Sequence, residues 1–386
     1  MRCADTRALA TRRNDASIGA PRQGSPTELA EQVEIRLLAE CCRSSFANPG
    51  PIIVHGEVDW NLFLRLARFH RVESLAWRAL AADAELPERA REVLAEAAAR
   101  VAAHNLQSAA SCRALLGAFE SAGVPLLFLK GLTLGALAYG NPALKAAIDI
   151  DLLVDPTDLG KAAELLRNCD YTLIAPRESS QDTILRSWHR SWKESVWMKN
   201  VPRLQVDLHT RVADNPRLLP TMDVHSPQQT VDIGGGIRLP TLAARELFAY
   251  LAVHGASSAW FRLKWISDFA ALLGAASAER IDGLYRDSQK LGAGRAAGQA
   301  LLLAHHLFRT LEKNPALEEE LGRDSVTQRL YRAALRQVTG EPSEPTESRF
   351  GTLTIHWTQL FLLPGASYKL SELVRHVSRP KVGARR

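Results

Sequence analysis

Apolar residues recur at helical spacing along the first third of the chain. Between residues 26 and 122 they fall three and four positions apart, which is the period of an amphipathic helix. The turn ANPGP at 47–51 and the capping residue Asp59 before Trp60 divide this stretch. The pattern predicts an N-terminal helical region over residues 26–122.

The period changes at Val124, where short apolar runs replace the helical spacing. The segments VPLLFLKG, IDIDLLV, YTLI, ESVWMK and RLQVDLHTRV predict strands, and helical segments separate the first three of them. A β-α-β-α-β run followed by a hairpin forms a small mixed sheet with helices packed on it. We place this core over residues 123–240, where a second hairpin turns on Gly234 to Gly236.

Helical spacing returns after the core. It runs from Leu242 to about Gln337 and predicts a C-terminal helical region over residues 241–340. The stretch GEPSEPTES is typical of a linker or exposed loop, so we expect a linker and a basic segment over residues 341–386. The polar, arginine-rich start predicts a disordered basic tail over residues 1–25. The expected fold class is α+β, a small mixed sheet flanked by helical regions.

Composition narrows the class of protein. The 386 residues are 46% hydrophobic and 23% charged, which is ordinary for a folded globular chain. No apolar run reaches about 18 residues and no apolar leader opens the chain, so neither a membrane span nor a signal peptide is expected. The five cysteines lack CxxC spacing, which favours neither a disulfide framework nor a zinc site, and a cytoplasmic location is expected.

The charge pattern leaves nucleic acid open as a partner without favouring it. The net charge of +6 arises from 48 basic and 42 acidic residues, with much of the excess near the two ends, where basic residues are usually solvated. The stretch RSWHRSWKESVWMK places basic residues among Trp188, Trp192 and Trp197, a pattern that can clamp single-stranded nucleic acid. We favour the alternative, in which an amphipathic element packs its tryptophans on the sheet.

The run AAIDIDLLVD at 146–155 places Asp149 and Asp151 in a predicted strand. Residues two apart in a strand point to the same side, so the two carboxylates stand roughly 6–7 Å apart. Unless both simply end a strand in water, their repulsion calls for a cation, and Mg²⁺ takes carboxylate oxygens together with substrate phosphates. Asp155, beside Pro156, is better interpreted as a helix cap.

Two further features support a metal and phosphate site. Lys130 and Gly131 lie at a strand-to-helix turn, where backbone N–H groups can bind a phosphate, although taken alone the turn is also an ordinary connection. Asp207 in a later strand can complete a two-metal site or take a proton from an attacking hydroxyl, or can simply end its strand. His209 either contacts a phosphate, orients the aspartate or makes a structural hydrogen bond.

In this order the motifs resemble those of the polymerase-β-type nucleotidyltransferase superfamily. More narrowly, LLFLKGLTLGALAYGNPALKAAIDIDLLV followed by VDLHTRV is similar to a largely uncharacterised bacterial nucleotidyltransferase family. The helical flanks are similar to that family at Trp60, Ala67, His70, Val72, His254, Arg262, Leu263, Trp265 and Asp268. Two positions depart from the pattern: Lys145 stands where the family usually has arginine, which loses bidentate phosphate geometry, and Leu132 stands where the superfamily has a serine hydroxyl.

The resemblance implies Mg²⁺-dependent transfer of a nucleoside monophosphate from an NTP, with ATP as the expected donor and pyrophosphate leaving. The acceptor would be a hydroxyl or phosphate of a small molecule, peptide, protein or RNA. The implied site consists of the metal-binding and catalytic carboxylates Asp149, Asp151 and Asp207 and the nucleotide-binding candidates Lys130, Gly131, Lys145 and His209. The alternative is a protein of this fold that binds or regulates without turnover.

Overall fold

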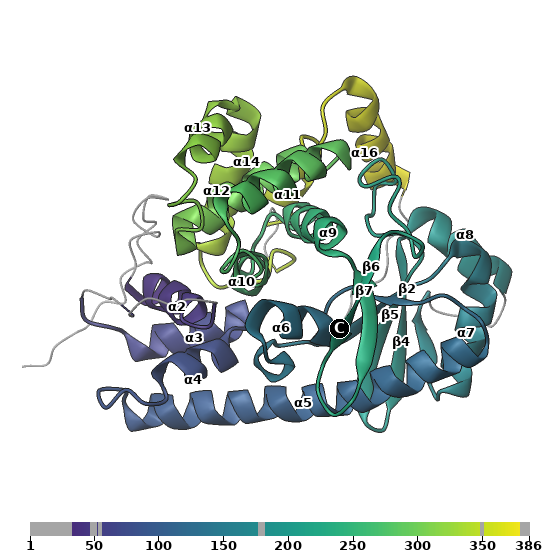
Figure 1. Ribbon diagram of the computed structural model, residues 1–386, viewed down its shortest axis with the longest axis horizontal. Helices are drawn as coiled ribbons and strands as arrows, with labels where there is room; N and C mark the ends of the chain where they lie inside the picture. Colours follow the sequence, from purple (N-terminus) through teal and green to yellow (C-terminus); the bar gives the residue numbers. More distant parts are fainter. Residues whose placement is uncertain (1–32, 47–51, 53–55, 177–181, 348–350, 379–386) are drawn as a thin grey trace, which may run out of the picture.

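The computed structural model describes residues 33–46, 52, 56–176, 182–347 and 351–378. The expected tail over residues 1–25 and the end of the basic C-terminal segment lie outside this described part. Figure 1 shows the arrangement of the elements, with a sheet at one end of the molecule and most of the helices at the other. Within the described residues, no helix combines the length and the apolarity that crossing a bilayer requires.

A five-stranded mixed sheet forms the core that the sequence predicts. Its strands are β1 (Leu127–Phe128), β2 (Asp149–Leu153), β3 (Thr172–Ala175), β4 (Glu194–Asn200) and β5 (Arg203–His209). In space they follow the order β1-β2-β5-β4-β3. β2 and β5 run parallel, and the other neighbouring pairs run antiparallel. Together with the helices at both ends, this sheet confirms the α+β fold class.

The parallel pairing of β2 with β5 decides which side chains meet. Asp151 lies directly opposite Asp207 in this ladder, and Asp149 lies opposite Gln205. Because residues two apart share a face, the three carboxylates project from the same side of the sheet. The alternate residues are buried in the apolar core on the other side, namely Ile150, Leu152, Val206 and Leu208.

Two helices cover that apolar face. They are α5 (Glu88–Ser121) and α7 (Leu159–Asn168). Buried residues of α7 and of the C-terminal part of α5 join the same hydrophobic cluster as the strands, whereas Ala90 and Leu94 near the start of α5 pack in the helical core. α5 has 34 residues, which makes it about 50 Å long. It therefore runs along one side of the whole molecule, from the N-terminal helices to the sheet (Figure 1).

Short elements connect the strands. They are α6 (Leu132–Tyr139), η1 (Pro142–Leu144), η2 (Pro156–Asp158), α8 (Asp182–Ser191), and the hairpin of β6 (Gln228–Asp232) with β7 (Arg238–Leu242). The expected glycine turn of this hairpin is confirmed, because residues 234–236 all have positive φ angles. Asp155 is confirmed as a cap, since its Oδ1 accepts a hydrogen bond of 2.8 Å from the N–H of Thr157.

The helices before and after the sheet share one hydrophobic core. The N-terminal ones are α2 (Val33–Arg43), α3 (Trp60–His70) and α4 (Glu73–Leu80). The C-terminal ones are α9 (Ala244–Ser257), α10 (Leu263–Ala271), α11 (Ala278–Lys290), α12 (Gly294–Phe308), α13 (Pro315–Arg323), α14 (Ser325–Val338), α15 (Leu353–Gln359) and α16 (Ala366–Ser378). Buried residues of α2, α3 and α4 lie in one cluster with those of α9, α10 and α12, so segments far apart in sequence form one helical body.

The tryptophan-rich stretch packs on the sheet, as the favoured interpretation predicts. Trp197 in β4 is fully buried. Trp188 and Trp192 are half-buried and stack on each other with ring centroids 5.3 Å apart. The Nε1–H of Trp188 donates to the carbonyl of Glu194. These rings therefore serve the packing of α8 against β4.

The junction between α9 and α10 depends on a glycine. A Cβ at Gly255 would lie 2.3 Å from the ring of the fully buried Trp260. We expect Gly255→Ala to lower the free energy of unfolding by about 1–3 kcal/mol, because the ring has no room to retreat. In α11, a Cβ at Gly283 would meet nothing within 4 Å, so Gly283→Ala should raise stability by roughly 0.5–1 kcal/mol. Urea unfolding followed by circular dichroism measures both, and equal effects would contradict the packing explanation.

Candidate functional site

Three carboxylates meet where β2 and β5 lie side by side. Asp149, Asp151 and Asp207 each offer an oxygen, and these oxygens all lie within 4.8 Å of one another. Asp151 and Asp207 are only 3% and 6% exposed, whereas Asp149 is more accessible. Buried like charges at this separation are unfavourable without a cation. The structure therefore brings together the three acids that the sequence singles out.

The two oxygens of Asp151 have different surroundings. Lys130 Nζ lies 2.9 Å and His209 Nε2 lies 3.0 Å from Oδ1. Oδ2 is buried and has no hydrogen-bond partner among the described residues. A buried carboxylate oxygen without a partner is costly, and a metal ligand is one of the explanations that native proteins provide for such an atom. With three oxygen donors and one of them unsatisfied, these residues fit a divalent cation.

The surroundings of the two buried acids shift their pKa values in opposite directions. Burial alone would raise the pKa of Asp151, but Lys130 and His209 hold it well below its usual range. Burial raises the pKa of Asp207 well above its usual range, and the neighbouring carboxylates, Glu194 foremost, raise it further. Gln205 Nε2 donates to Asp207 Oδ1 at 2.8 Å and partly offsets this effect. Asp151 is thus held ionised, whereas Asp207 keeps its proton more readily.

His209 lies behind Asp151 and away from solvent. Its ring is fully buried, and its Nε2 lies 3.5 Å from Glu194 Oε2 as well as within reach of Asp151. Glu194 in turn forms an ion pair with Lys193. Of the three roles that the sequence leaves open for His209, this geometry corresponds to orienting the aspartate. Sequence reasoning missed Glu194, although the predicted hairpin of β4 and β5 places it directly opposite His209.

The turn after β1 has the backbone geometry that a glycine permits. Gly131 precedes α6 with φ 69° and ψ −125°, which side chains of L-residues rarely adopt. A Cβ there would lie 3.7 Å from the carbonyl oxygen of Asp149. Conformation rather than space therefore favours glycine, and the turn places Lys130 beside β2.

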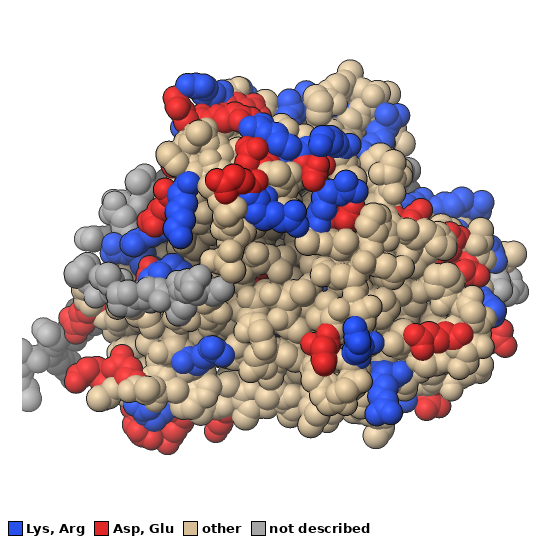
Figure 2. Space-filling view, in the orientation of Figure 1, with Lys and Arg blue, Asp and Glu red and all other residues tan. Residues whose placement is uncertain are grey.

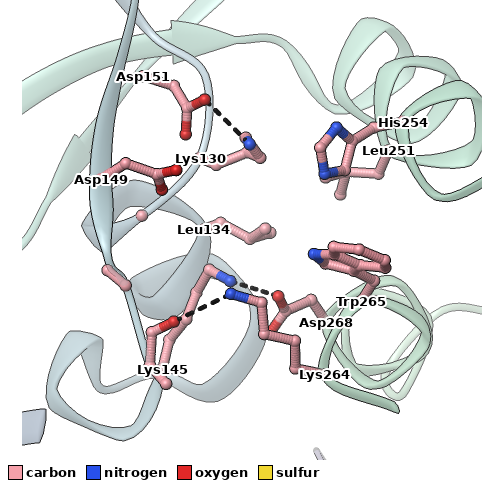
Figure 3. Close-up of a pocket in the computed structure, with 13 residues that line it drawn as sticks. Lys130, Leu134, Lys145, Asp149, Asp151, Leu251, His254, Lys264, Trp265 and Asp268 are labelled. Atoms are coloured by element: carbon pink, nitrogen blue, oxygen red, sulfur yellow. Dashed lines mark hydrogen bonds and ion pairs between the residues drawn. The ribbon is translucent and has the colours of Figure 1, made fainter. Parts of the chain in front are cut away.

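A pocket opens beside Asp149 and Asp151, with its far wall formed by α9 and α10 (Figure 3). Three lysines line it, and two of them are neutralised. Lys130 is paired with Asp151, and the buried Lys145 is paired with Asp268. Asp268 also accepts a hydrogen bond of 2.9 Å from the hydroxyl of Tyr139. Lys145 thus lines the pocket but its charge is already compensated.

Lys264 differs from the other two lysines. Its Nζ donates to the carbonyl of Ala146 at 3.3 Å, and among the described residues no carboxylate forms an ion pair with it. Burial and the nearby Lys145 lower the pKa of Lys264 to about 7. The side chain is therefore poised to gain a positive charge when an anion enters the pocket.

Two residues of the helical flanks fix α10 in place. His70 Nδ1 accepts a hydrogen bond of 3.1 Å from the backbone N–H of Leu263, at the start of α10. The buried Arg262 donates to the carbonyl of Phe69 and forms an ion pair with Glu344. Neither residue lines the pocket. They join the end of α3 to α10 and so position Lys264.

The aromatic wall of the pocket comes from the same flanks. The ring of His254 packs edge-to-face on Trp265, with centroids 5.7 Å apart, and both line the pocket. Burial and the neighbouring lysines lower the pKa of His254 well below its usual range, so the ring is neutral at physiological pH. Asp207 and His209 lie outside the lining of this pocket, and Lys130, Gly131, Lys145, Asp149 and Asp151 lie within it.

Comparison with known families agrees with this geometry. The family described as uncharacterised nucleotidyltransferase matches residues 56–309, a stretch that runs from just before α3 to just after α12 and includes every residue of the pocket. No curated protein matches the chain.

The contact of His70 with α10 predicts a pH dependence of stability. Burial and Arg262 lower the pKa of His70 to about 3, whereas an unfolded histidine titrates near 6.5. Between these two pH values the unfolded chain binds more protons at this histidine than the folded chain does. The stability that His70 contributes is therefore present above pH 6.5 and is lost as the pH falls. His70→Gln keeps an acceptor for the N–H of Leu263 but binds no proton. The loss of unfolding free energy between pH 7 and 5.5 should be smaller by about 1 kcal/mol in this variant.

Urea unfolding at several pH values measures this difference. The matched control is His225→Gln, because the ring of His225 is exposed. The control should follow the wild-type pH dependence. A His70→Gln variant with the same pH dependence as the wild type would show that His70 is not buried in its neutral form.

Proposed function

The chain belongs to the uncharacterised nucleotidyltransferase family, and from this premise we propose that it transfers a nucleoside monophosphate from an NTP to an acceptor hydroxyl or phosphate. ATP is the expected donor, Mg²⁺ the expected cation, and a polymerase-β-type reaction the expected chemistry. The carboxylate cluster carries this proposal, because its three oxygens lie within 4.8 Å of one another and Asp151 Oδ2 is buried without a partner among the described residues.

Asp149, Asp151 and Asp207 would hold the divalent cation. When bound, Mg²⁺ would neutralise charge on the phosphates and favour the approach of the acceptor oxygen to the α-phosphorus. Lys130 and His209 hold Asp151 through Oδ1, which leaves Oδ2 as a ligand atom of fixed orientation. His209 would therefore act on the cation site through Asp151 rather than on a phosphate.

Asp207 is suited to receive the proton of the acceptor. A cation bound at the cluster would favour the ionised form of Asp207, and this carboxylate can then accept the proton of an acceptor hydroxyl beside it. In the proposed reaction an acceptor oxygen forms a bond to the α-phosphorus, and the bond from that phosphorus to the oxygen bridging to the β-phosphate breaks. The acceptor proton moves to Asp207, and pyrophosphate leaves with the electron pair of the broken bond.

Lys264 would bind the β- and γ-phosphates, with the turn at Lys130 and Gly131 on the opposite side. Lys130 and Lys145 are each compensated by an aspartate, so they add little net charge for a ligand. Lys264 has only a carbonyl partner among the described residues. A phosphate beside it would raise its pKa and hold it in the charged form. Lys264 is therefore the lysine of this pocket best suited to bind phosphate, ahead of the candidates Lys130 and Lys145.

Loss of Asp151 should abolish the reaction. The purified protein is incubated with Mg²⁺, a cell extract and each labelled NTP in turn, and pyrophosphate release and labelled product are measured. Asp151→Asn should lower the rate by at least about 10²-fold, because the ligand oxygen loses its charge. Asp155→Asn is the matched control: Asp155 lies two residues beyond the end of the same strand, outside the cluster, and asparagine still caps a helix.

The possible outcomes distinguish an active enzyme from the alternatives. Asp155→Asn should retain the wild-type rate. A wild-type protein that binds no NTP in Mg²⁺, or an Asp151→Asn variant that is fully active, would overturn the proposal. A protein that binds NTP but turns over with no acceptor pool would instead be a binding or regulatory member of the family.

Replacing Lys264 should separate triphosphate binding from base binding. Lys264→Met keeps the length of the side chain but loses the charge, and a hydrogen bond to a charged group contributes about 1.5–3 kcal/mol. Affinity for ATP and for tripolyphosphate should therefore fall about tenfold or more, while affinity for AMP should hardly change. Calorimetric titration in Mg²⁺ measures all three ligands. Lys290→Met, on the exposed face of α11, is the control, and equal losses for ATP and AMP would contradict the assignment.

A further inference from the structure

Two aromatic side chains on the far wall of the pocket carry polar groups that face the cavity. His254 comes from α9 and Trp265 from α10. Figure 3 shows both ring nitrogens of His254 and the indole nitrogen of Trp265 on the side of the cavity, across from Asp149 and Asp151. Among the described residues, none of these three nitrogens has a hydrogen-bond partner. They are therefore available to a ligand.

Packing holds both rings in place. Trp265 packs edge-to-face on Phe261, with ring centroids 4.9 Å apart, and on His254 at 5.7 Å. The ring of the fully buried Tyr250 lies 5.9 Å from that of His254. Side chains that are already oriented lose little conformational entropy when a ligand binds. The three nitrogens are thus presented to the cavity at fixed positions.

The neutral form of His254 determines what it can bind. Burial and the neighbouring Lys130 and Lys193 hold the pKa of His254 well below its usual range. A neutral imidazole has one donor and one acceptor nitrogen, whereas the indole of Trp265 only donates. Phosphate oxygens only accept hydrogen bonds, so a triphosphate on this wall would leave the acceptor nitrogen of His254 unpaired. A nucleoside offers both donors and acceptors, in its sugar hydroxyls and its base edge.

The cationic and the neutral groups of the pocket lie apart. Leu134 and Leu251 line the cavity together with the two aromatic rings. An apolar lining with a few placed polar groups is typical of sites that bind the body of a small molecule. In Figure 3, Lys264 reaches the cavity from the opposite end to His254, with Trp265 between them. The pocket therefore has one end suited to phosphate and another suited to a nucleoside.

The outer surface adds little to the recognition of charge. On the face shown in Figure 2, the basic side chains of the described residues lie among acidic ones. A surface of mixed charge attracts a polyanion only weakly. Recognition of the phosphates is therefore left to the inside of the pocket, chiefly to Lys264, which has only a carbonyl partner among the described residues.

We propose that His254 and Trp265 bind the nucleoside of the donor nucleotide, at the end of the pocket away from Lys264. Trp265 donates through Nε1, and His254 both donates and accepts. The inference rests on the proposed nucleotidyl transfer, since it assigns one part of the donor to one wall of the same pocket. It makes these two residues the ones that distinguish a nucleotide from inorganic polyphosphate.

Calorimetric titration of the full-length protein with ATP, AMP and tripolyphosphate in Mg²⁺ tests this assignment. His254→Phe and Trp265→Phe keep an aromatic ring on the wall but lose the nitrogens. Each variant should lose about threefold to tenfold in affinity for ATP and for AMP, because hydrogen bonds to the nucleoside are lost, and should bind tripolyphosphate like the wild type. Trp357→Phe, at a 42% exposed tryptophan of α15 outside the pocket, is the matched control and should change none of the three affinities.

A third variant separates binding from packing. His254→Gln removes the ring but keeps a donor and an acceptor, so it should bind AMP more tightly than His254→Phe does. Equal loss of AMP affinity in these two variants would show that the ring only packs, and would overturn the assignment.

The other outcomes separate this assignment from the proposed function. Loss of tripolyphosphate affinity equal to that of ATP in His254→Phe and Trp265→Phe would assign the wall to phosphate and overturn the inference, as would unchanged AMP affinity. In both cases nucleotide binding, and with it the proposed function, would stand. A wild type that binds none of the three ligands would overturn the proposed function and the assignment together.

Discussion

The parallel pairing of β2 with β5 imposes the constraint around which the site is built. It sets Asp151 directly opposite Asp207 on a buried face, where two like charges are unfavourable without compensation. Among the described residues, Lys130 and His209 contact one oxygen of Asp151 and leave the other without a partner, and Gln205 donates to one oxygen of Asp207. The remaining repulsion between the carboxylates favours the binding of a cation. The positive φ of Gly131 supports this arrangement, because the turn at Gly131 places Lys130 beside β2.

The helical body is the second half of the site rather than an addition to the sheet. The sheet supplies the carboxylates and the turn, while α9 and α10 supply the opposite wall of the pocket. α10 is held by the end of α3, through His70 with Leu263 and Arg262 with Phe69. Segments on both sides of the core in sequence must therefore fold together before the pocket exists.

Local patterns explain what the sequence predicts correctly. The strand of Asp149 and Asp151, the glycine hairpin and the caps at Asp59 and Asp155 depend on residues within a few positions of one another, and all are confirmed. The three aspartates could be singled out because the period of a strand places Asp149 and Asp151 on one face. Two helices of the C-terminal segment, α15 and α16, were not expected, because the polar stretch before them is typical of a linker.

Local sequence patterns do not predict which residues far apart in the sequence contact each other. The sequence indicates Lys145 as a nucleotide-binding candidate, yet its charge is compensated by Asp268, a residue 123 positions away. His209 lies opposite Glu194 in the hairpin and 3.5 Å from its carboxylate, and Glu372 of α16 accepts a hydrogen bond from Asn215, 157 positions away. In each case the residue type indicates what chemistry is available. Only the tertiary contact decides whether that chemistry is used for packing or faces a ligand.

Two groups of the site, Asp207 and Lys264, have shifted pKa values, and they would respond to the cation and to the triphosphate respectively. Burial and neighbouring acids raise the pKa of Asp207, and burial with a neighbouring lysine lowers the pKa of Lys264 to about 7. Both shifts favour the neutral form, so the protein groups of the site carry less buried charge than the residue types indicate. A cation favours ionised Asp207, and a phosphate favours charged Lys264. In the proposed reaction, a triphosphate that arrives with its cation would hold both groups in their charged forms at once, whereas either ligand alone would leave one of the two groups neutral.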